Sequence, residues 1–393
     1  MTRPEYHVEG GVLSWMRRTS GLDEAEAASA LGVPQEVLKS WEDGKTTPSV
    51  TKVRLIAKTY GRPLSAVFLP NAPQAELMPN DFRPRTVGGA PPRITKTLIL
   101  AVRQALDWRD GVTELAEEDD KLLPHADIPA VDRSANPASL GETFRQKSGF
   151  SYDDQLFLQS DAVFRTWREI VEEHGILVFL LGKKTLPRES CRAFSLWGGQ
   201  DPPVIALSRD DTAPVAHSFS LLHEYAHLML GQQAICAERE GTWEGGAVEG
   251  FCNRFAASAL MPTTLMNLVL DEPFPNYANR HWSMKSIGDL ARRLSVSRPA
   301  LALRLEHLGA AAPGLYEWVE QQIASEPKPS KKSGGGAKWP QVRVNERGNQ
   351  YCRTIFLAWT SGLISLAGAA EMLNVRTHYV PALDYLVGSE RRV

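Results

Sequence analysis

Cysteine is scarce in this sequence, and the few cysteines do not form a site. The 393 residues include four cysteines, Cys191, Cys236, Cys252 and Cys352, which lie far apart without a C-x-x-C pair. This spacing excludes a disulfide framework and a cysteine zinc knuckle. It favours a reducing, cytoplasmic environment.

Long apolar runs and an excess of one charge are also missing. No segment approaches the roughly 18 apolar residues of a membrane helix, and the start, MTRPEYHVEGG, lacks the apolar core of a signal peptide. With 44 basic and 46 acidic residues the net charge is -2, so any nucleic-acid binding must depend on a local patch. We expect a soluble protein of two or three domains with no membrane partner.

The first seventy residues have the pattern of a helix-turn-helix. Short helices broken by Gly and Pro fill residues 12–70. Among them an apolar helix with Ala27, Ala28 and Leu31 is followed by Gly32 and by a second helix containing Leu38. The stretch EAASALGVPQEVLKSWEDGKTTPS resembles the XRE, or lambda-repressor-like, helix-turn-helix family.

The charge of this module predicts weak DNA binding. Residues 1–70 carry nine Lys or Arg against eight Asp or Glu, and phosphate contacts dominate DNA affinity. The candidate DNA-contacting residues are Gln35, Lys39 and Ser40 on the second helix and Arg17 and Arg18 on the first. Docking onto another repressor-like protein is the alternative use of the module.

A change of hydrophobic period follows the linker. Residues 73–92 are rich in Pro and Asn, and helices are expected over 93–118 and 161–175. The runs 176–181, 191–199 and 202–209 are short and β-rich, which predicts three strands of a small antiparallel sheet. The strand VIALS, 204–208, is a candidate edge for pairing with an extended substrate.

The helix expected over 216–230 contains HEYAH, an HExxH motif. His223 and His227 are four residues apart and therefore share one helix face, where two imidazoles can bind one Zn²⁺. Glu224 is placed to act on a water rather than to ligate the ion. The alternative interpretation is that the two histidines belong to an ordinary buried helix and bind no metal. Polar side chains on so apolar a helix need partners, however, and a metal would supply them.

A third ligand is expected from the next helix, 247–260. Glu249 lies on its apolar stripe, where an acid is costly unless it is paired or bound to metal. Glu238, Glu240 and Glu244 are alternatives in the intervening loop. Asn253 could orient a ligand from one turn further along.

Together these segments resemble the ImmA/IrrE family of metallopeptidases. The resemblance rests on HSFSLLHEYAHLMLG, on EGFCNRFAASALMP and on the XRE module joined through DFR, and it covers about residues 10 to 310. It implies a zinc site with His223, His227 and Glu249 as ligands and Glu224 as general base. The expected fold is α+β, with an all-helical first domain, a zincin-like domain with a small sheet, and a mainly helical end.

The resemblance also implies the division of the chain and its function. We expect a zinc-dependent endopeptidase that cleaves a repressor-like or antitoxin-like protein, with DNA as a second partner and a homodimer allowed. The alternative is a DNA-binding regulator or antitoxin whose peptidase-like domain senses or binds a partner without proteolysis. The expected segments are a helix-turn-helix domain at 1–72, a linker at 73–92, the peptidase domain at 93–280, a helix-turn-helix-like segment at 281–324, a flexible linker at 325–339 and a helical region at 340–393 of unassigned role.

Overall fold

The computed structural model describes residues 7–73, 95–188, 191–198, 201–209, 214–231, 234–236, 247–270, 281–326 and 339–389. The chain divides into two compact units, one made of residues 1–82 and 93–104 and the other of residues 83–92 and 105–393. Within the described residues, no helix has both the length and the apolar character to cross a bilayer.

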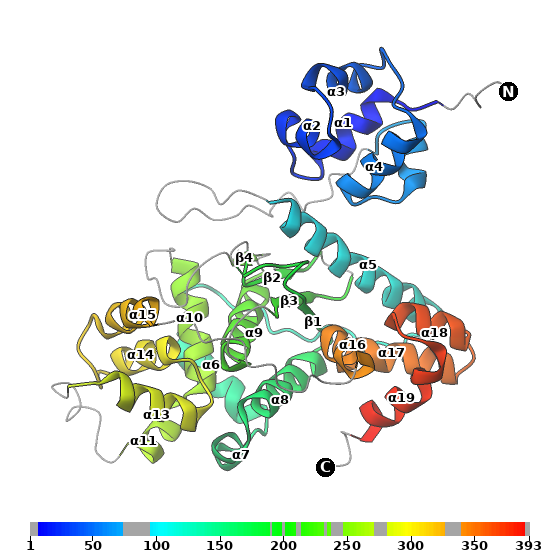
Figure 1. The fold of residues 1–393 in the computed structure, drawn as a ribbon. Coiled ribbons are helices and arrows are strands. Elements are labelled where there is room, and N and C mark those ends of the chain that lie inside the picture. The colour runs from blue at the N-terminus through cyan, green and yellow to red at the C-terminus, as the bar shows by residue number, and fades with distance from the viewer. Residues whose placement is uncertain are drawn as a thin grey trace. The chain divides into compact units, whose positions relative to one another are not determined.

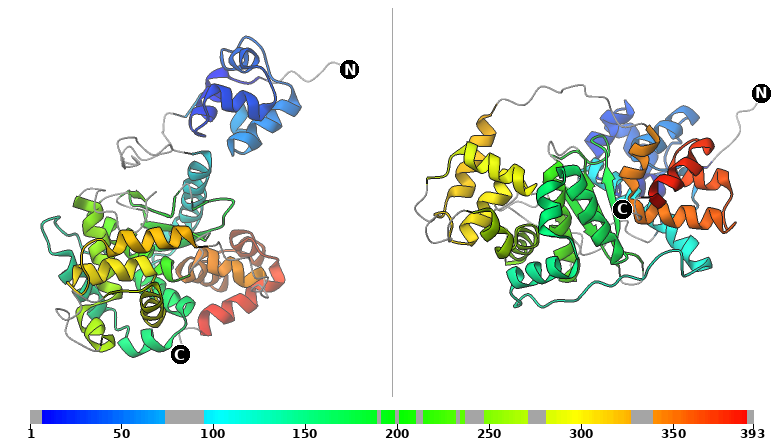
Figure 2. Two further views of the ribbon diagram at one scale, coloured as in Figure 1. Left: turned by 60° about the vertical axis from the view of Figure 1, so that its left-hand side comes forward. Right: turned by 90° about the horizontal axis from the view of Figure 1, so that it is seen from below.

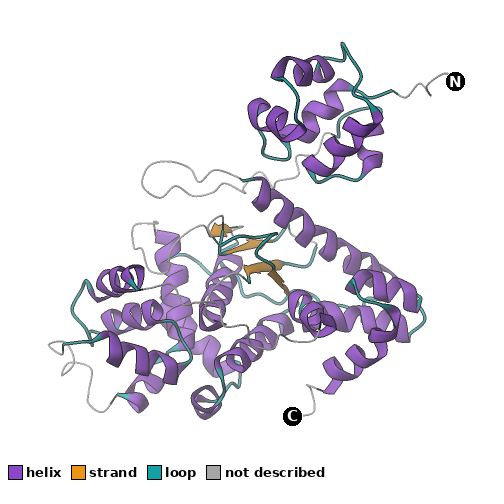
Figure 3. Cartoon of the chain, viewed as in Figure 1, coloured by secondary structure: helices purple, strands orange, loops and turns teal. Residues whose placement is uncertain are grey.

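The first unit is all-helical, as the sequence predicts (Figures 1 and 3). Its apolar core includes Leu13, Leu31 and Ile56. Asp23 and Glu26 form a capping box at the second helix, and Gly32 ends that helix in the left-handed conformation. Its elements are α1 (Gly10–Arg18), α2 (Glu24–Leu31), α3 (Gln35–Glu42), α4 (Val50–Tyr60), η1 (Leu64–Phe68) and the beginning of α5 (Lys96–Glu118).

The second unit surrounds a four-stranded sheet with helices (Figure 1). Before and within the sheet come α6 (Pro137–Lys147), α7 (Tyr152–Phe157), α8 (Ser160–Glu173), β1 (Leu177–Leu181), β2 (Ala193–Leu196), β3 (Val204–Ser208), α9 (Pro214–Met229), β4 (Ala234–Cys236), α10 (Ala247–Leu260) and α11 (Thr263–Val269). After them come α13 (Met284–Leu294), α14 (Arg298–His307), α15 (Leu315–Ser325), α16 (Trp339–Arg347), α17 (Asn349–Thr360), α18 (Leu366–Leu373), η3 (Thr377–Tyr379) and α19 (Val380–Ser389).

The sheet corrects two expectations. Its order is β1-β3-β2-β4, and β1 pairs with β3 in parallel, from Leu177 opposite Val204 to Leu181 opposite Ser208. The other two pairs are antiparallel, so the sheet is mixed rather than antiparallel. β3 has a neighbour on each side and cannot serve as the free edge. β4, which the sequence did not suggest, is the edge strand beside β2. The α+β class is confirmed.

Helices on one side of the sheet position α10. Gly141 of α6 faces the backbone of α10, and a Cβ there would stand 2.4 Å from the carbonyl oxygen of Phe255. A side chain at this position would therefore push the two helices apart. At the far end of α10, Arg304 of α14 donates to the carbonyl oxygen of Met261 at 2.7 Å and to Ser258 Oγ at 2.8 Å. Two flanking helices thus hold α10 in place.

The C-terminal helices pack on the β1 edge (Figure 2). The views place α16–α19 on the opposite side of the sheet from α13–α15. Arg168 Nε of α8 lies 3.2 Å from Glu172 Oε1, and Glu172 Oε2 accepts the N–H of Gln350 at 3.2 Å. This buried pair joins α8 to α17. The described tail, residues 339–389, contains four α-helices, and most of both expected linkers lies outside the described residues.

Candidate metal centre

Helix α9 supplies the two histidines. Its apolar residues pack against α8, α10 and the sheet, and Gly231 follows it in the left-handed conformation with φ 65°. His223 and His227 lie one turn apart, with side chains 10% and 1% exposed. The spacing of the motif therefore places both rings on the face that looks toward α10.

Helix α10 supplies Glu249 and Asn253. Glu249 lies in its first turn, where the helix dipole favours a carboxylate, and its side chain is 14% exposed. Asn253 follows one turn later and is buried. The sequence-predicted ligand and its neighbour thus reach α9 from one facing helix.

The three predicted ligands converge. His223 Nε2 and His227 Nε2 are 3.1 Å apart, and they lie 3.2 and 3.5 Å from the two carboxylate oxygens of Glu249. One ligand atom from each residue falls within 4.8 Å of the others. Asn253 Oδ1 is 2.9 Å from His223 Nδ1. Because this amide oxygen accepts, Nδ1 donates, which leaves Nε2 directed at the cluster.

The charges at the cluster favour a cation. Burial alone would lower the pKa of His223, but its hydrogen bond to Glu249 and the carboxylates of Glu249 and Glu224 raise that pKa above the ordinary value. Burial would raise the pKa of Glu249, yet its contacts with His223 and His227 hold it well below its usual range. The site thus favours positive charge, which a proton or a divalent metal ion can supply.

The buried carboxylate of Glu224 tests whether a metal fits. Glu224 is fully buried, and neither carboxylate oxygen has a hydrogen-bond partner among the described residues. A buried carboxylate without a partner is costly. Two imidazoles and one carboxylate beside it form the ligand set of a catalytic zinc site, which keeps a position for water. The residues present fit the metal.

Two other polar rings of α9 contact groups outside this cluster, and the alternative third ligands are not among the described residues. Glu238, Glu240 and Glu244, the alternative ligands, lie outside the described residues. His217 Nε2 is 3.1 Å from the carbonyl oxygen of Ser208, and Tyr225 packs between aromatic rings, 4.8 Å from Phe144 and 6.0 Å from Phe255. His217 thus contacts the end of β3, and Tyr225 takes part in packing α9 against α6 and α10.

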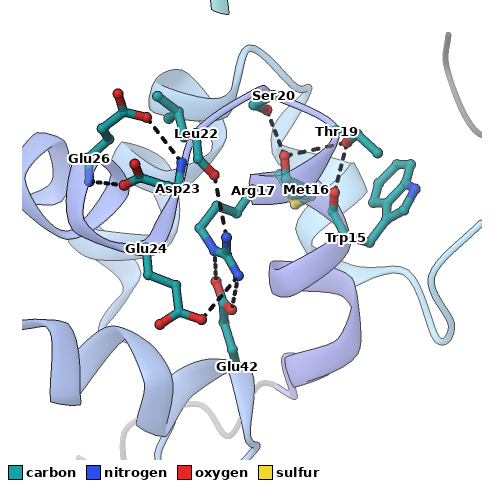
Figure 4. Close-up of polar contacts among 10 residues, drawn as sticks. All are labelled: Trp15, Met16, Arg17, Thr19, Ser20, Leu22, Asp23, Glu24, Glu26 and Glu42. Carbon is teal, nitrogen blue, oxygen red and sulfur yellow. Dashed lines mark hydrogen bonds and ion pairs between the residues drawn. The ribbon is translucent and has the colours of Figure 1, made fainter. Parts of the chain in front are cut away.

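The candidate DNA-contacting residues differ in accessibility (Figure 4). Arg17 is buried, and its Nε and Nη2 donate to the two carboxylate oxygens of Glu42 at 2.8 and 2.9 Å. This bidentate pair links α1 to α3, so the expected role of Arg17 in DNA contact is corrected to a structural one. Gln35, Lys39 and Arg18 are exposed, whereas Ser40 is half-buried with Oγ 2.6 Å from Thr46 Oγ1.

Two residues that support the site escaped the sequence reasoning. Gly141 and Arg304 both fix α10, although neither touches a ligand. Two features of the sequence could have indicated them. Gly141 lies in the middle of an otherwise good helix, and Arg304 lies within the apolar run PALALRLEHL.

Comparison with known families agrees with this geometry. Residues 171–306 match the peptidase M78 family model, described as the IrrE N-terminal-like domain, and residues 13–67 match a helix-turn-helix model. The first match contains all three clustered residues and Glu224. No curated protein and no solved structure matches the chain. Residues 13–67 are therefore similar to a helix-turn-helix domain, and residues 171–306 are similar to a peptidase domain of the IrrE N-terminal-like kind.

Proposed function

We propose that the chain is a zinc-dependent endopeptidase that cleaves a repressor-like or antitoxin-like regulatory protein. The observation that carries this proposal is the convergence of His223, His227 and Glu249 beside the buried carboxylate of Glu224. His223 and His227 would hold the metal through Nε2, and Glu249 through its carboxylate. When bound, the metal supplies a Lewis acid that polarises the peptide carbonyl and acidifies a water molecule.

The chain's own residues would handle protons and orientation. The carboxylate of Glu224 accepts a proton from the attacking water and delivers it to the leaving amine nitrogen. Asn253 holds the His223 ring through Nδ1, so that Nε2 keeps its direction throughout the reaction. The burial of Glu224 excludes bulk water, which strengthens its electrostatic interactions with the reacting groups.

An extended part of the substrate would pair with the sheet at β4. This strand ends the order β1-β3-β2-β4 and is antiparallel to β2. Exposed strand edges bind extended peptides through main-chain hydrogen bonds. The cleavage site would therefore lie in a loop or an unfolded segment of the substrate.

The helix-turn-helix would bring the peptidase to DNA or to a repressor bound there. Gln35 and Lys39 on α3 and Arg18 on α1 are exposed for such contacts. Glu36 lies exposed beside them and repels phosphate. We expect weak binding by a single copy of this module.

Metal content tests the ligand assignment first. The purified chain should hold about one zinc or similar divalent ion, and the double variant His223→Ala/His227→Ala should lose it. Glu249→Ala should weaken metal binding, whereas Glu238→Ala, Glu240→Ala and Glu244→Ala should not. Full metal retention in the double variant, measured by elemental analysis, would refute the metal centre.

Glu224→Gln then separates proteolysis from partner binding. Glutamine keeps the size of the side chain but cannot take a proton, so the metal should stay while cleavage falls by about 10²- to 10⁴-fold. The variant should retain substrate proteins that the wild type releases as fragments. If Glu224→Gln regulates its target genes in cells as well as the wild type does, the chain acts as a regulator without proteolysis.

A further inference from the structure

Three corners between helices in this chain share one backbone geometry. In each, a helix ends at a residue in the left-handed conformation, and a second helix begins within a few residues. The left-handed residues are Gly32, Ser295 and Asn374, with φ values of 61°, 53° and 52°. Ser295 and Asn374 are the non-glycine residues with positive φ in the described chain, and both stand at such a corner.

The hydrogen bonds and the core residues of the corners also agree. The left-handed residue and the valine after it both donate their N–H groups to the carbonyl of one buried alanine, four residues before the left-handed position. A buried leucine directly precedes that position. The alanines are Ala28, Ala291 and Ala370, the leucines Leu31, Leu294 and Leu373, and the valines Val33, Val296 and Val375.

The first corner lies inside the segment that matches a helix-turn-helix, and the other two share its alanine, leucine and valine positions and its hydrogen bonds. Neither family model covers the third corner, between α18 and α19. Helix α17 packs against both α18 and α19, so the three helices form one packed group. The structure thus assigns a further helix-turn-helix to residues 349–389.

The corners differ in what their second helix faces. In the middle corner, α14 is buried from Pro299 to Leu305 within the core of the second unit. No base pair could reach it. In the third corner, Thr377 and His378 are exposed before α19, and along α19 Pro381, Ala382 and Tyr385 follow as one exposed stripe. The third corner therefore presents its second helix as the first corner does.

The chemistry of this exposed face suits a nucleic acid. Arg376, Thr377 and His378 stand at the beginning of the second helix, the part that reaches base edges in helix-turn-helix proteins. Asp384, beside this stripe on α19, is half-buried and lines a cleft of about 550 Å³ with Phe356 and Val387. We propose that α18 and α19 bind duplex DNA, which gives the chain a second DNA-reading element.

Two features bear on the choice of partner. Glu371 is the one acidic residue between positions 361 and 383, and it is exposed on α18, where it would repel phosphate. Leu357, Leu363 and Tyr385 are 50%, 40% and 79% exposed, which is the kind of surface that a protein partner would cover. The continuous stretch without acid from Met372 to Leu383 favours DNA.

The test uses the full chain and fluorescent DNA duplexes with a random core of about 20 base pairs, the length of two helix-turn-helix half-sites. Sequences that bind the wild type are first enriched from this pool. Arg376→Ala should lower affinity about tenfold and reduce the slope of affinity against salt by about one. Glu371→Gln should raise affinity because it removes a repelling charge. Lys39→Ala, in the first corner, should lower affinity independently of Arg376→Ala.

Arg165→Ala is the matched control. Arg165 is a 53% exposed arginine of α8, and its loss should leave DNA affinity within about twofold, as expected for a surface residue outside the interface. The unfolding temperature of each variant shows whether it is folded. If Arg376→Ala is misfolded, the DNA affinity of Glu371→Gln decides whether α18 and α19 bind DNA. Three results would overturn the proposal: no DNA binding by the wild type, equal affinity in wild type, Arg376→Ala and Glu371→Gln, or loss of a protein partner instead of DNA in Arg376→Ala.

Discussion

Helices α3 and α14 follow the same corner but face opposite environments. In α3, Leu38 and Trp41 are buried and the remaining residues are at least partly exposed. In α14, seven consecutive residues are buried, including the charged Arg304. The corner geometry is specified by an alanine, a leucine and a left-handed residue. What the second helix contacts is specified by its own remaining positions.

The position seven residues after the left-handed one gives the sharpest contrast. It is Lys39 in α3 and the fully buried Ala302 in α14. Ala302→Lys should destabilise the second unit by about 4 kcal/mol or more, because it buries an unpaired charge and overfills the core. Lys39→Ala should change the free energy of unfolding of the first unit by at most about 0.5 kcal/mol. Calorimetry would measure both changes in the free energy of unfolding. Similar values for the two variants would contradict the contrast between α3 and α14.

Acid should lower the free energy of unfolding of the second unit through His307, at the end of α14. Burial, together with the positive charges of Arg254 and Arg304, lowers the pKa of His307 to about 4. The unfolded chain then binds a proton that the folded chain does not, between an ordinary pKa of 6.5 and about 4. The stabilisation from neutral His307 is complete above that range and is lost as the pH falls through it.

The expected loss at pH 5 relative to pH 7 is about 2 kcal/mol. Denaturant unfolding of wild type and His307→Gln at both values isolates this contribution, because every other titrating group is present in both proteins. Parallel pH dependence of the two proteins would show that His307 is not held neutral.

The left-handed residues themselves should give the smallest effect. Ser295→Gly should stabilise the second unit by about 0.5–1 kcal/mol, because glycine adopts this conformation without a Cβ clash. Asn374→Gly should gain less, since asparagine tolerates it better. Gly32→Ser should cost about 1 kcal/mol in the first unit. A stabilising Gly32→Ser, seen in thermal unfolding, would contradict a shared corner geometry.

Local patterns predicted most of the elements that carry the site. The HExxH spacing, the acid on an apolar stripe and the Ala-Leu-Gly corner each act within one or two helical turns, so Glu249 and the α2–α3 corner could be placed from the sequence. The parallel β1–β3 pair and the edge position of β4 depend on contacts between distant segments, and no local pattern reports them.

The third corner was missed for a different reason. Asn374 stands where the first corner has glycine, so the weaker of the two usual residues marked the helix end. A search for the repeated pattern A-x-x-L-x-V, in which the x before the valine is small or polar, would have revealed it. Gly141 and Arg304 escaped because their partners on α10 are far away in the sequence.

Gly141 has a consequence for how this protein tolerates change. Its missing side chain allows α6 to lie against the backbone at Phe255, on the helix that carries Glu249. The position of a helix that carries a proposed metal ligand is therefore set by a residue without a side chain. A survey of all single substitutions should find Gly141 as intolerant as the proposed ligands, and a family alignment read without the structure would mistake it for part of the chemistry.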